Sequence, residues 1–466
     1  MGLVVATSRP MRRFAILAAA ILSAAPAFAQ DLGGQDLTTK AAAVRDKALA
    51  DPTAWRVVES LTTEVGPRPV GSPAMARARD WAVATLMALG FENVHVEPFT
   101  TRVWTRGEEA AEIVGPAPQK LQIIGLGNSA PTPTGGLAAA IAVFPTFQAM
   151  LDQPPGALKG KIAVVTQKMP RTQDGSSNGA IGVQRFQGPL EAARRGAVGY
   201  LVRSLSTDKT RLPHAGASTP AGIPAAALSG PDAEQLERLA ARGGPVTVRL
   251  VLSSSVQPAA PAWTVVGEIK GSARPNEVVL LGGHLDSWDP GTGAIDDGAG
   301  VAIATGAAHV AIAAGRPRRT IRVVMWGSEE QTGSGAAYAV AHKAEIPGIV
   351  VAGESDLGAG RIWRVSLPAR GAATPAMAAF KAAAAPLGVI FADAPPKYPG
   401  ADLEETTAAG APFVQFSQDA SHYFDWHHSA DDTLDKIKPD ELAQDVAVWA
   451  SFLYVVANSD VDFRKP

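Results

Sequence analysis

The sequence predicts an α/β protein with a mixed, mostly parallel sheet that is flanked by helices and interrupted by a β-rich insert. From Trp263 onward, apolar runs typical of strands alternate with helical runs, which is typical of parallel strands joined by helices. Between residues 105 and 262, short β-like runs are instead separated by Pro and Gly clusters. The length of 466 residues fits two or three domains.

The N-terminus resembles a secretory signal peptide over residues 1–29. Arg12 and Arg13 precede an apolar run that ends in the small-residue pattern Ala27-Phe28-Ala29. The run is shorter than the roughly 20 residues that span a bilayer. We therefore expect cleavage after Ala29, export to the periplasm or the medium, and no membrane attachment after cleavage. Both Met1 and Met11 are possible starts.

Residues 30–104 are expected to form the first part of the α/β domain. The run 52–64 predicts a helix. Ser72 and Pro73 supply an N-cap and a proline at the first position of a second helix. Alternating apolar residues from Val94 to Phe99 then predict a strand.

Residues 105–262 are expected to form the insert. Its candidate strands are Leu121–Gly125, Ala140–Phe144, Lys161–Thr166, Val198–Val202 and Val246–Val251. Its candidate helices are Pro189–Arg195 and Pro231–Arg242. Its single histidine, His214, falls in a loop rich in Pro and Gly, and few of its side chains are suited to catalysis.

Residues 263–466 are expected to complete the α/β domain. The candidate strands are Glu277–Gly283, Thr320–Gly327, Gly348–Ala352 and Pro412–Ser417. The candidate helices are Gly298–Ala314, Gly335–Lys343, Thr374–Leu387 and Asp440–Val456, the last with a single apolar stripe. Because open α/β sheets bind ligands at the carboxyl ends of their strands, chemistry is expected there.

The amino-acid composition excludes several kinds of binding partner and catalytic site. Lysine and arginine number 42 against 44 acidic residues, so no net positive field favours nucleic acid or an anionic membrane. Cysteine is absent, which excludes disulfides, thiolate nucleophiles and thiolate metal ligands. Any metal must be bound by His, Asp and Glu.

Polar motifs follow the expected strands. They are His284-Leu285-Asp286, Asp296-Asp297-Gly298, Glu329-Glu330, Asp356, and His427-His428 with Asp432-Thr433. Each has an ordinary structural explanation when taken alone: a buried histidine, a helix cap or an acidic turn. Together they place imidazole and carboxylate groups after four strands of one sheet, a composition that suits two zinc ions bridged by a carboxylate.

The order of these motifs resembles the co-catalytic zinc exopeptidase family, which includes leucyl aminopeptidases and glutamate carboxypeptidases. The plasma glutamate carboxypeptidase (carboxypeptidase Q) branch looks most similar, over Gly282–Gly300, Gly327–Tyr338, Glu354–Gly358 and Tyr423–Thr433. The insert is similar to a protease-associated domain at Lys159–Ile162, Arg195–Gly199 and Ile223–Ala226. The resemblance thus implies a zinc exopeptidase fold with an inserted protease-associated domain.

The resemblance also implies roles for matching residues, with two Zn²⁺ per chain. The implied metal ligands are His284 and Asp356 for one ion, Glu330 and His428 for the other, and Asp296 as the bridge. The implied catalytic residues are Glu329 as general base, Asp286 orienting His284, and Tyr423 donating to the tetrahedral oxyanion. Asp297 would shape a turn with a cis peptide bond. Structural roles are expected for His427, His95, His309 and His342.

The expected activity is hydrolysis of terminal bonds of short peptides or dipeptides by a metal-bridged hydroxide, with Glu329 as base. A glutaminyl cyclase-like, single-zinc acyltransferase and a catalytically inactive peptide- or protein-binding relative are the alternatives. Thr332 and Ala336 depart from leucyl aminopeptidase-like members, so side-chain preference does not transfer. Amino- versus carboxy-terminal specificity and formation of a homodimer are left open.

Overall fold

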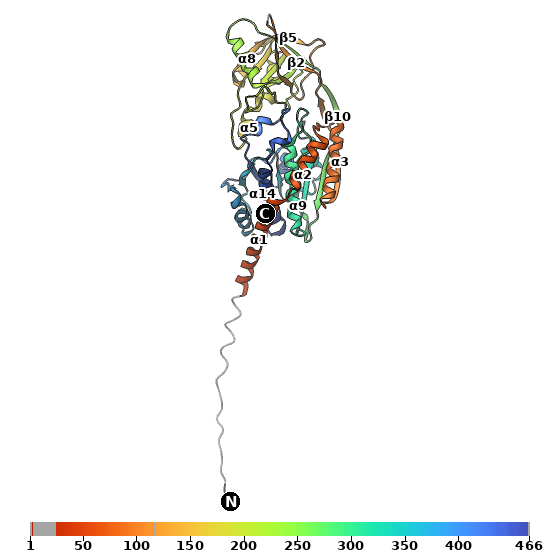
Figure 1. Ribbon diagram of the computed structural model, residues 1–466, viewed down its shortest axis with the longest axis vertical. Coiled ribbons are helices and arrows are strands. Elements are labelled where there is room, and N and C mark those ends of the chain that lie inside the picture. The colour runs from red at the N-terminus through yellow and green to blue at the C-terminus, as the bar shows by residue number, and fades with distance from the viewer. Residues whose placement is uncertain (1, 3–24, 116, 465–466) are drawn as a thin grey trace.

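The computed structural model describes residues 2, 25–115 and 117–464 (Figure 1). The basic and apolar parts of the expected signal peptide lie outside the described residues, so that prediction is not addressed by the fold. From Ala25 the chain forms α1 (Ala25–Ala50). Among the described residues, no helix combines the length and apolar character needed to cross a membrane.

A five-stranded mixed sheet forms the centre of the α/β part, as predicted. Its strand order is β1 (Glu92–Thr105), β10 (Ser255–Ile269), β12 (Arg319–Trp326), β11 (Arg274–His284) and β13 (Ile349–Glu354). The last three strands are parallel, whereas β1 and β10 pair in antiparallel fashion. β10 also pairs with β12 in antiparallel fashion, through Val265–Ile269. Antiparallel pairing is therefore more extensive than expected, because no part of β10 was predicted as a strand.

Helices cover both faces of this sheet, and alternate residues of β11 show it. Val279 and Leu281 belong to one core, with α9 (Ala299–Ala313), α14 (Pro439–Asn458) and α2 (Thr53–Ser60). Val278 and Leu280 belong to another, with residues of β12 and α10 (Ser334–Ala341). Continuous apolar runs in β11, β12 and β13 follow from this two-sided burial.

Two predicted helices differ in how well the sequence describes them. In α3 (Pro73–Ala88), the Ser72 side chain accepts a hydrogen bond from the Met75 backbone N–H and Pro73 is the first residue, which confirms the predicted start. In α14, residues well beyond the predicted stripe are buried, because α1, α9 and α11 (Pro375–Ala384) all pack around it.

The insert forms a second sheet of eight strands at the opposite end of the molecule (Figure 1). Its strand order is β3 (Gln119–Leu121), β2 (Glu109–Val114), β9 (Thr247–Leu252), β5 (Leu137–Phe144), β6 (Ile162–Val165), β7 (Gly199–Arg203), β8 (Ala225–Leu228) and β4 (Ile123–Gly125). Its helices are α4 (Phe147–Leu151), α5 (Ser176–Ile181), α6 (Val183–Phe186), α7 (Gly188–Arg194) and α8 (Gly230–Ala241). The paired strands β1 and β10 lead into it, and the domain boundaries at 104/105 and 262/263 stay predictions.

A third, three-stranded sheet corrects one expectation. It consists of β15 (Ile390–Phe391), β14 (Ile362–Ser366) and β16 (Gln415–Gln418), and the short helices α12 (Glu404–Ala408) and α13 (Tyr423–Trp426) flank β16 in sequence. The segment with His427 and His428 follows β16 and α13. Just before β16, Phe413 pairs in parallel with Ala352 of β13. The predicted strand Pro412–Ser417 therefore adjoins the central sheet at its start, but the part that leads to His427 and His428 belongs to the third sheet.

Candidate metal centre

Three parallel strands bring most of the predicted site residues to one edge of the sheet. His284 is the last residue of β11, Glu329 and Glu330 follow β12, and Asp356 follows β13. Asp296 lies in the turn Ala294–Gly298 that precedes α9. Because the carboxyl ends of parallel strands share an edge, residues more than 70 positions apart in sequence become neighbours.

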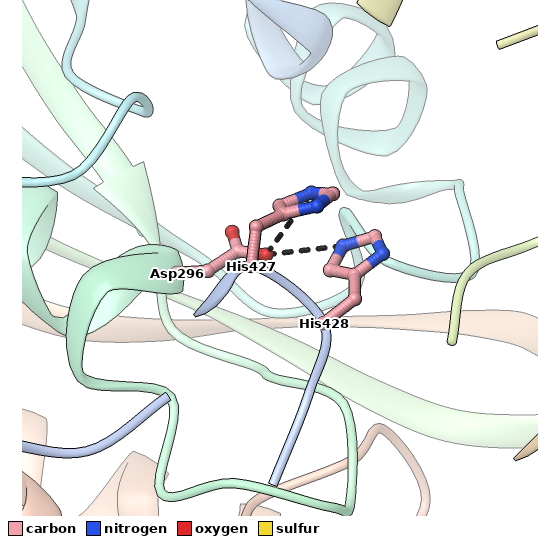
Figure 2. A group of neighbouring side chains, drawn as sticks. All are labelled: Asp296, His427 and His428. Carbon is pink, nitrogen blue, oxygen red and sulfur yellow. Dashed lines mark ion pairs between the residues drawn. The ribbon is translucent and has the colours of Figure 1, made fainter. Parts of the chain in front are cut away.

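Asp296 lies between two imidazoles. Its Oδ1 is 3.1 Å from Nε2 of His284, and its Oδ2 is 3.0 Å from Nε2 of His428. The His427 and His428 rings both face the Asp296 carboxylate in Figure 2. Each oxygen of one carboxylate thus faces a different histidine.

A second carboxylate accompanies each histidine. Asp356 Oδ1 is 3.6 Å from Nε2 of His284, and Glu330 Oε2 is 3.0 Å from Nε2 of His428. The five predicted ligands therefore form two groups that share Asp296, although their binding of metal stays a prediction. Other combinations of ligand atoms also cluster within 4.8 Å, such as His284 with Asp297 and Asp356.

The side chains at this centre are suited to binding zinc, and two unpartnered carboxylate oxygens are independent evidence for it. Asp296 Oδ2 and Glu330 Oε1 are buried and have no hydrogen-bond partner among the described residues. Although Oδ2 lies 3.0 Å from His428 Nε2, this contact does not have hydrogen-bond geometry. Buried carboxylate oxygens that lack a hydrogen-bond partner and lie beside imidazole nitrogens are typical of a zinc site.

The electrostatics of the centre also favour a cation. Burial acts to raise the pKa of Asp296, yet the hydrogen bond with His284 and the positive charge of His428 bring it well below the usual range. Burial raises the pKa of Glu330 to about 7. Burial opposes protonation of His428, but Glu330 and Asp296 raise its pKa to about 9. Without metal, His428 therefore holds a proton, which zinc must displace on binding.

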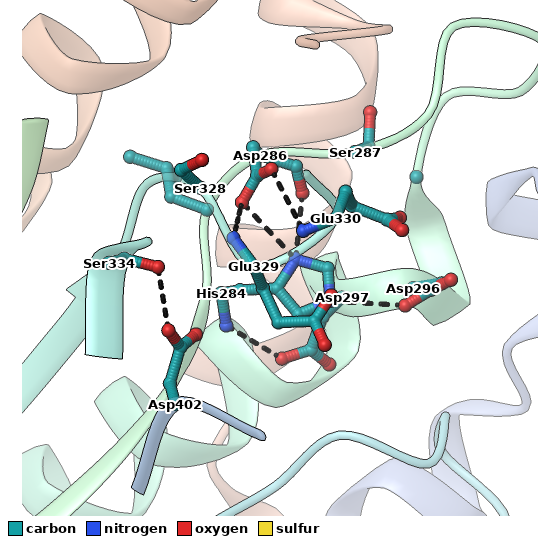
Figure 3. Close-up of polar contacts among 12 residues, drawn as sticks. His284, Asp286, Ser287, Asp296, Asp297, Ser328, Glu329, Glu330, Ser334 and Asp402 are labelled. Atoms are coloured by element: carbon teal, nitrogen blue, oxygen red, sulfur yellow. Dashed lines mark hydrogen bonds and ion pairs between the residues drawn. The ribbon is translucent and has the colours of Figure 1, made fainter. Parts of the chain in front are cut away.

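Asp286 connects two of these strand ends (Figure 3). Its Oδ1 accepts a hydrogen bond of 3.0 Å from the Glu329 backbone N–H, and its Oδ2 accepts one of 3.3 Å from Glu330. His284 Nδ1 lies 3.0 Å from the Asp286 backbone carbonyl and 3.6 Å from the carboxylate. The carbonyl is thus the nearer partner of the imidazole, and the carboxylate holds the Glu329-Glu330 turn.

Glu329 has the environment of a proton acceptor. Burial raises the pKa of its carboxyl group well above the usual range, and the charges of Asp356 and Glu330 raise it further, against the opposing effect of His284. A carboxylate with a raised pKa accepts a proton at neutral pH more readily than an exposed one. In Figure 3 the Glu329 backbone N–H is directed at the Asp286 carboxylate.

Asp297 fixes the start of α9 rather than facing the two histidines. Its Oδ2 accepts a hydrogen bond of 3.0 Å from the His284 backbone N–H, and its Oδ1 accepts one of 2.8 Å from Gly300. The peptide bond between Asp296 and Asp297 is cis, as the resemblance implied. This arrangement agrees with the turn-shaping role expected for Asp297.

Two aromatic side chains, Tyr423 and His427, lie beside the candidate metal ligands. Tyr423 is buried, and burial together with the Asp296 carboxylate raises its pKa well above the usual range, so it retains its proton and can donate it. His427 stacks on His428 with ring centroids 3.5 Å apart, and its Nε2 is 3.5 Å from Asp296 Oδ2. A structural role, packing or lining the cleft, was expected for His427, and its ring packs on His428 and also lies against the candidate bridging residue.

The other histidines expected to be structural contact groups elsewhere. His342 Nε2 lies 2.7 Å from a Glu97 carboxylate oxygen and His95 Nε2 lies 3.0 Å from the same residue. His309 Nδ1 faces the Leu89 carbonyl at 3.4 Å. None of these contacts involves a predicted ligand.

Arg68 is a residue that sequence reasoning missed. Its buried guanidinium donates to the carbonyls of Leu285, Thr292 and Gly293, which belong to the loop between His284 and Asp296. The motif Gly66-Pro67-Arg68-Pro69 indicated only a helix end. An arginine between two prolines was the available signal, since a charged side chain in a rigid turn often has a fixed partner.

Two further acidic groups lie near the centre: Asp432, which the sequence motifs included without assigning it a role, and Asp402, which they missed. Asp432 Oδ1 accepts hydrogen bonds of 2.7 Å from the Ala294 and Ile295 backbone N–H groups, which orients the turn containing Asp296. Asp402 accepts a hydrogen bond of 2.6 Å from Ser334 (Figure 3), and burial raises its pKa to about 7. Both support segments that carry predicted site residues.

The insert reaches the centre through a short segment. His428 adopts a φ of 60°, which is uncommon outside glycine. Its carbonyl accepts a hydrogen bond of 2.8 Å from the Ala215 N–H, and its Nδ1 lies 3.3 Å from the Ala215 carbonyl. His214 Nδ1 lies 2.6 Å from the His427 carbonyl. These contacts hold the His427-His428 turn and leave Nε2 of His428 free to bind a metal.

This chain is similar in sequence to known peptidases. A family model described as peptidase family M28 matches residues 264–453. Carboxypeptidase Q of Mus musculus is 36% identical over 409 residues, which cover 86% of this chain and 84% of the relative. Carboxypeptidase Q of Homo sapiens is 35% identical over 407 residues, with coverage of 86% and 84%.

Solved structures are similar over the same length. The crystal structure of a peptidase M28 precursor from Shewanella amazonensis SB2B has a TM-score of 0.89 and 43% identity, covering 93% of this chain and 99% of that one. The zinc aminopeptidase BSAP from Bacillus subtilis has a TM-score of 0.64 and 19% identity, covering 88% and 95%, which shows a shared fold.

Proposed function

Because this chain belongs to peptidase family M28 and is a metallo-exopeptidase, we propose that it hydrolyses terminal peptide bonds of short peptides with two zinc ions. In this proposal His284 and Asp356 hold one ion, Glu330 and His428 hold the other, and Asp296 bridges them. The substrate is a short peptide or dipeptide, and no nucleic acid or membrane partner is required.

The observation that carries the proposal is the position of Asp296 between two histidines. Its two oxygens are 3.1 and 3.0 Å from Nε2 of His284 and of His428, respectively. One carboxylate can bridge two ions only when its oxygens face different ligand groups. The buried, unpartnered Asp296 Oδ2 and Glu330 Oε1 further support a cation at this position.

The chain's own residues account for the proton transfers. Bound zinc supplies Lewis-acid chemistry, which polarises a carbonyl and lowers the pKa of water. Glu329 takes a proton from the attacking water and returns it to the leaving amine, as its raised pKa favours. Tyr423 keeps its hydroxyl proton and donates a hydrogen bond to the oxygen of the tetrahedral species. Asp286 keeps Glu329 in position through the backbone.

The test is a substrate screen with metal analysis. Purified, zinc-loaded protein is incubated with dipeptides, with N-acetylated peptides and with C-amidated peptides, and products are identified by mass spectrometry. We expect release of terminal residues, loss of activity with a chelator and recovery with zinc. Pyroglutamate formation at one zinc per chain would support the cyclase alternative, and metal-independent absence of turnover would support a binding protein.

Export is a separate part of the proposal. The basic residues, apolar run and Ala27-Phe28-Ala29 pattern of residues 1–29 support a cleaved signal peptide and a periplasmic or secreted product. N-terminal sequencing of the protein recovered outside the cytoplasm tests this, and a mature N-terminus at Gln30 is expected. An uncleaved N-terminus would reject it.

A further inference from the structure

The turn that follows Glu329 and Glu330 is bound to the strand that leads into the insert. Gln331 Oε1 accepts a hydrogen bond of 2.7 Å from the Trp104 backbone N–H, and Gln331 Nε2 donates one of 3.0 Å to the Trp104 carbonyl. Trp104 lies at the end of β1, 227 positions from Gln331 in the sequence. One side-chain amide therefore satisfies both backbone groups of a distant residue.

A second set of contacts joins the same two segments. Thr101 Oγ1, also in β1, donates a hydrogen bond of 3.1 Å to the Thr332 carbonyl. Thr332 has a φ of 68°, and its N–H donates a hydrogen bond of 2.8 Å to the Glu329 carbonyl, which closes the turn. A Cβ at Gly333, where φ is 125°, would lie 2.9 Å from Thr101 Oγ1. The turn therefore lies directly against β1.

The position of the candidate base depends on this turn. Among the residues that the structure describes, none donates a hydrogen bond to the Glu329 carboxylate, and only its backbone N–H is bound, by Asp286. The backbone therefore determines where the carboxylate lies. Asp286 holds the start of the turn at Glu329 and Glu330, whereas Gln331 and Thr101 hold its other side on β1.

Trp104 also contacts the insert and the other half of the centre. Its indole Nε1 donates a hydrogen bond of 3.0 Å to the Ser129 carbonyl in the insert. Its ring centroid lies 6.3 Å from that of Trp288, and the Trp288 centroid lies 5.8 Å from that of His428, edge-on in both cases. The residue that binds Gln331 is therefore itself fixed by the insert and by the ring that packs on a candidate zinc ligand.

We propose that Gln331 is a positioning residue, which fixes the turn of the base to the strand entering the insert, so that the insert takes part in placing Glu329. This inference rests on the proposed function, in which Glu329 is the general base. Gln331 touches neither the substrate nor the reacting atoms and acts only through the turn. A displacement of the base by about 1 Å is enough to slow a reaction about 10²-fold.

Gln331→Met tests the role, because it keeps the length of the side chain and removes both hydrogen bonds. We expect kcat to fall about 10- to 100-fold, with KM and the content of two zinc ions unchanged. Thr101→Val removes one hydrogen bond to the same turn and should lower kcat about 2- to 10-fold. Gln153→Met removes a side-chain bond of 3.2 Å to a carbonyl of α4 in the insert and is the matched control, with kcat unchanged.

Two further measurements separate positioning of the base from a general loss of stability. In zinc-loaded Gln331→Met, hydrogen exchange followed by mass spectrometry should rise in segments 101–106 and 328–334 and stay unchanged in the strands of the insert. In a Glu329→Gln background, Gln331→Met should lower the residual rate no further, because its effect passes through Glu329.

Three outcomes would overturn the inference. They are a wild-type kcat in Gln331→Met, a further fall of the same size in the Glu329→Gln background, and loss of zinc from Gln331→Met, which would make Gln331 a support of Glu330 instead. If Gln331→Met does not fold, Thr101→Val decides, and an unchanged kcat in that variant rejects the role. Failure of the proposed function would appear differently, as absence of turnover of every peptide by the wild-type protein.

Discussion

The Asp286 carboxylate accepts a hydrogen bond of 3.0 Å from the backbone N–H of Glu329, across the gap between the ends of β11 and β12. Asp286 also accepts from Glu330, so one side chain orients both the candidate base and a candidate ligand. The position of Glu329 is therefore set by a neighbouring strand as well as by its own turn.

Asp286→Asn should slow the reaction while zinc stays bound. An amide offers one acceptor oxygen in place of two, so one of the two backbone N–H groups loses its partner. We expect a fall of about 10- to 100-fold in kcat, the range found for supporting groups at metal sites. Asp289→Asn, a partly exposed position three residues later, is the control. Unchanged kcat in Asp286→Asn would contradict the assignment.

Glu329→Gln should retain both zinc ions and lose about 10²- to 10⁴-fold in kcat, because the amide cannot accept the proton of the attacking water. Zinc content and turnover are measured on the same preparation. A variant that keeps zinc and turns over at the wild-type rate would reject Glu329 as the base.

Metal content should distinguish the bridging residue from a terminal ligand. Asp296 contacts both histidines, whereas His428 belongs to one group. We expect His428→Ala to lose one of two zinc ions and Asp296→Ala to weaken both, as measured by elemental analysis after dialysis against dilute zinc. A single zinc in the wild-type protein would contradict the two-ion arrangement.

Arg68→Met should destabilise the protein and lower its affinity for zinc. Four carbonyls that now accept from the guanidinium would lose their donors, at a cost of about 3 kcal/mol or more in the free energy of unfolding. The freed loop also joins His284 to Asp296. Thermal unfolding and zinc titration measure both effects. Arg316→Met removes an exposed ion pair with Glu92 and should have a small effect.

His342 should make stability depend on pH. Burial disfavours its charge, but the carboxylates of Glu97 and Glu345 raise its pKa above the ordinary value. The stabilising charge is then fully present below the unfolded-state pKa of about 6.5 and is lost as pH rises through the folded-state value. His342→Gln should cost about 1 kcal/mol at pH 6, since Glu345 is half-exposed, and less at pH 9. Equal destabilisation at both pH values, in urea unfolding, would contradict this.

Local sequence patterns predicted those helices and strands in which the apolar positions coincide with the faces that are buried. Strands β11 and β12 are continuous apolar runs because both faces are covered, and α3 has a standard N-cap. By contrast, β8 is the run Ala225–Leu228, which lacks β-branched residues, and the start of β10 contains Pro258 and Pro261. Proline cannot donate to a ladder, so this half of β10 did not read as a strand.

The residues of the candidate site also fall into two groups, those that local motifs predicted and those that they did not. Motifs pointed to the five candidate ligands and Glu329, and the resemblance implied their roles, because the proposed chemistry requires these residue types next to strand ends. Arg68 was not identified, since its role arises from contacts with residues more than 200 positions away along the chain. The partner of His284 Nδ1 was also misassigned in part: a backbone carbonyl, which every residue carries, leaves no mark in a sequence.

The hydrogen bonds from Ala215 and His214 to the His427-His428 turn have a consequence for how activity arises. They join segments 213 positions apart in the sequence. His428 therefore acquires its orientation only after the central sheet and the sheet of the insert have formed and come into contact. Contacts between such distant segments form late in folding. In a partly folded or truncated chain, the sheet edge that carries His284 would be formed, but the His427-His428 turn would be unordered. Enzyme activity would therefore appear only once the whole chain has folded.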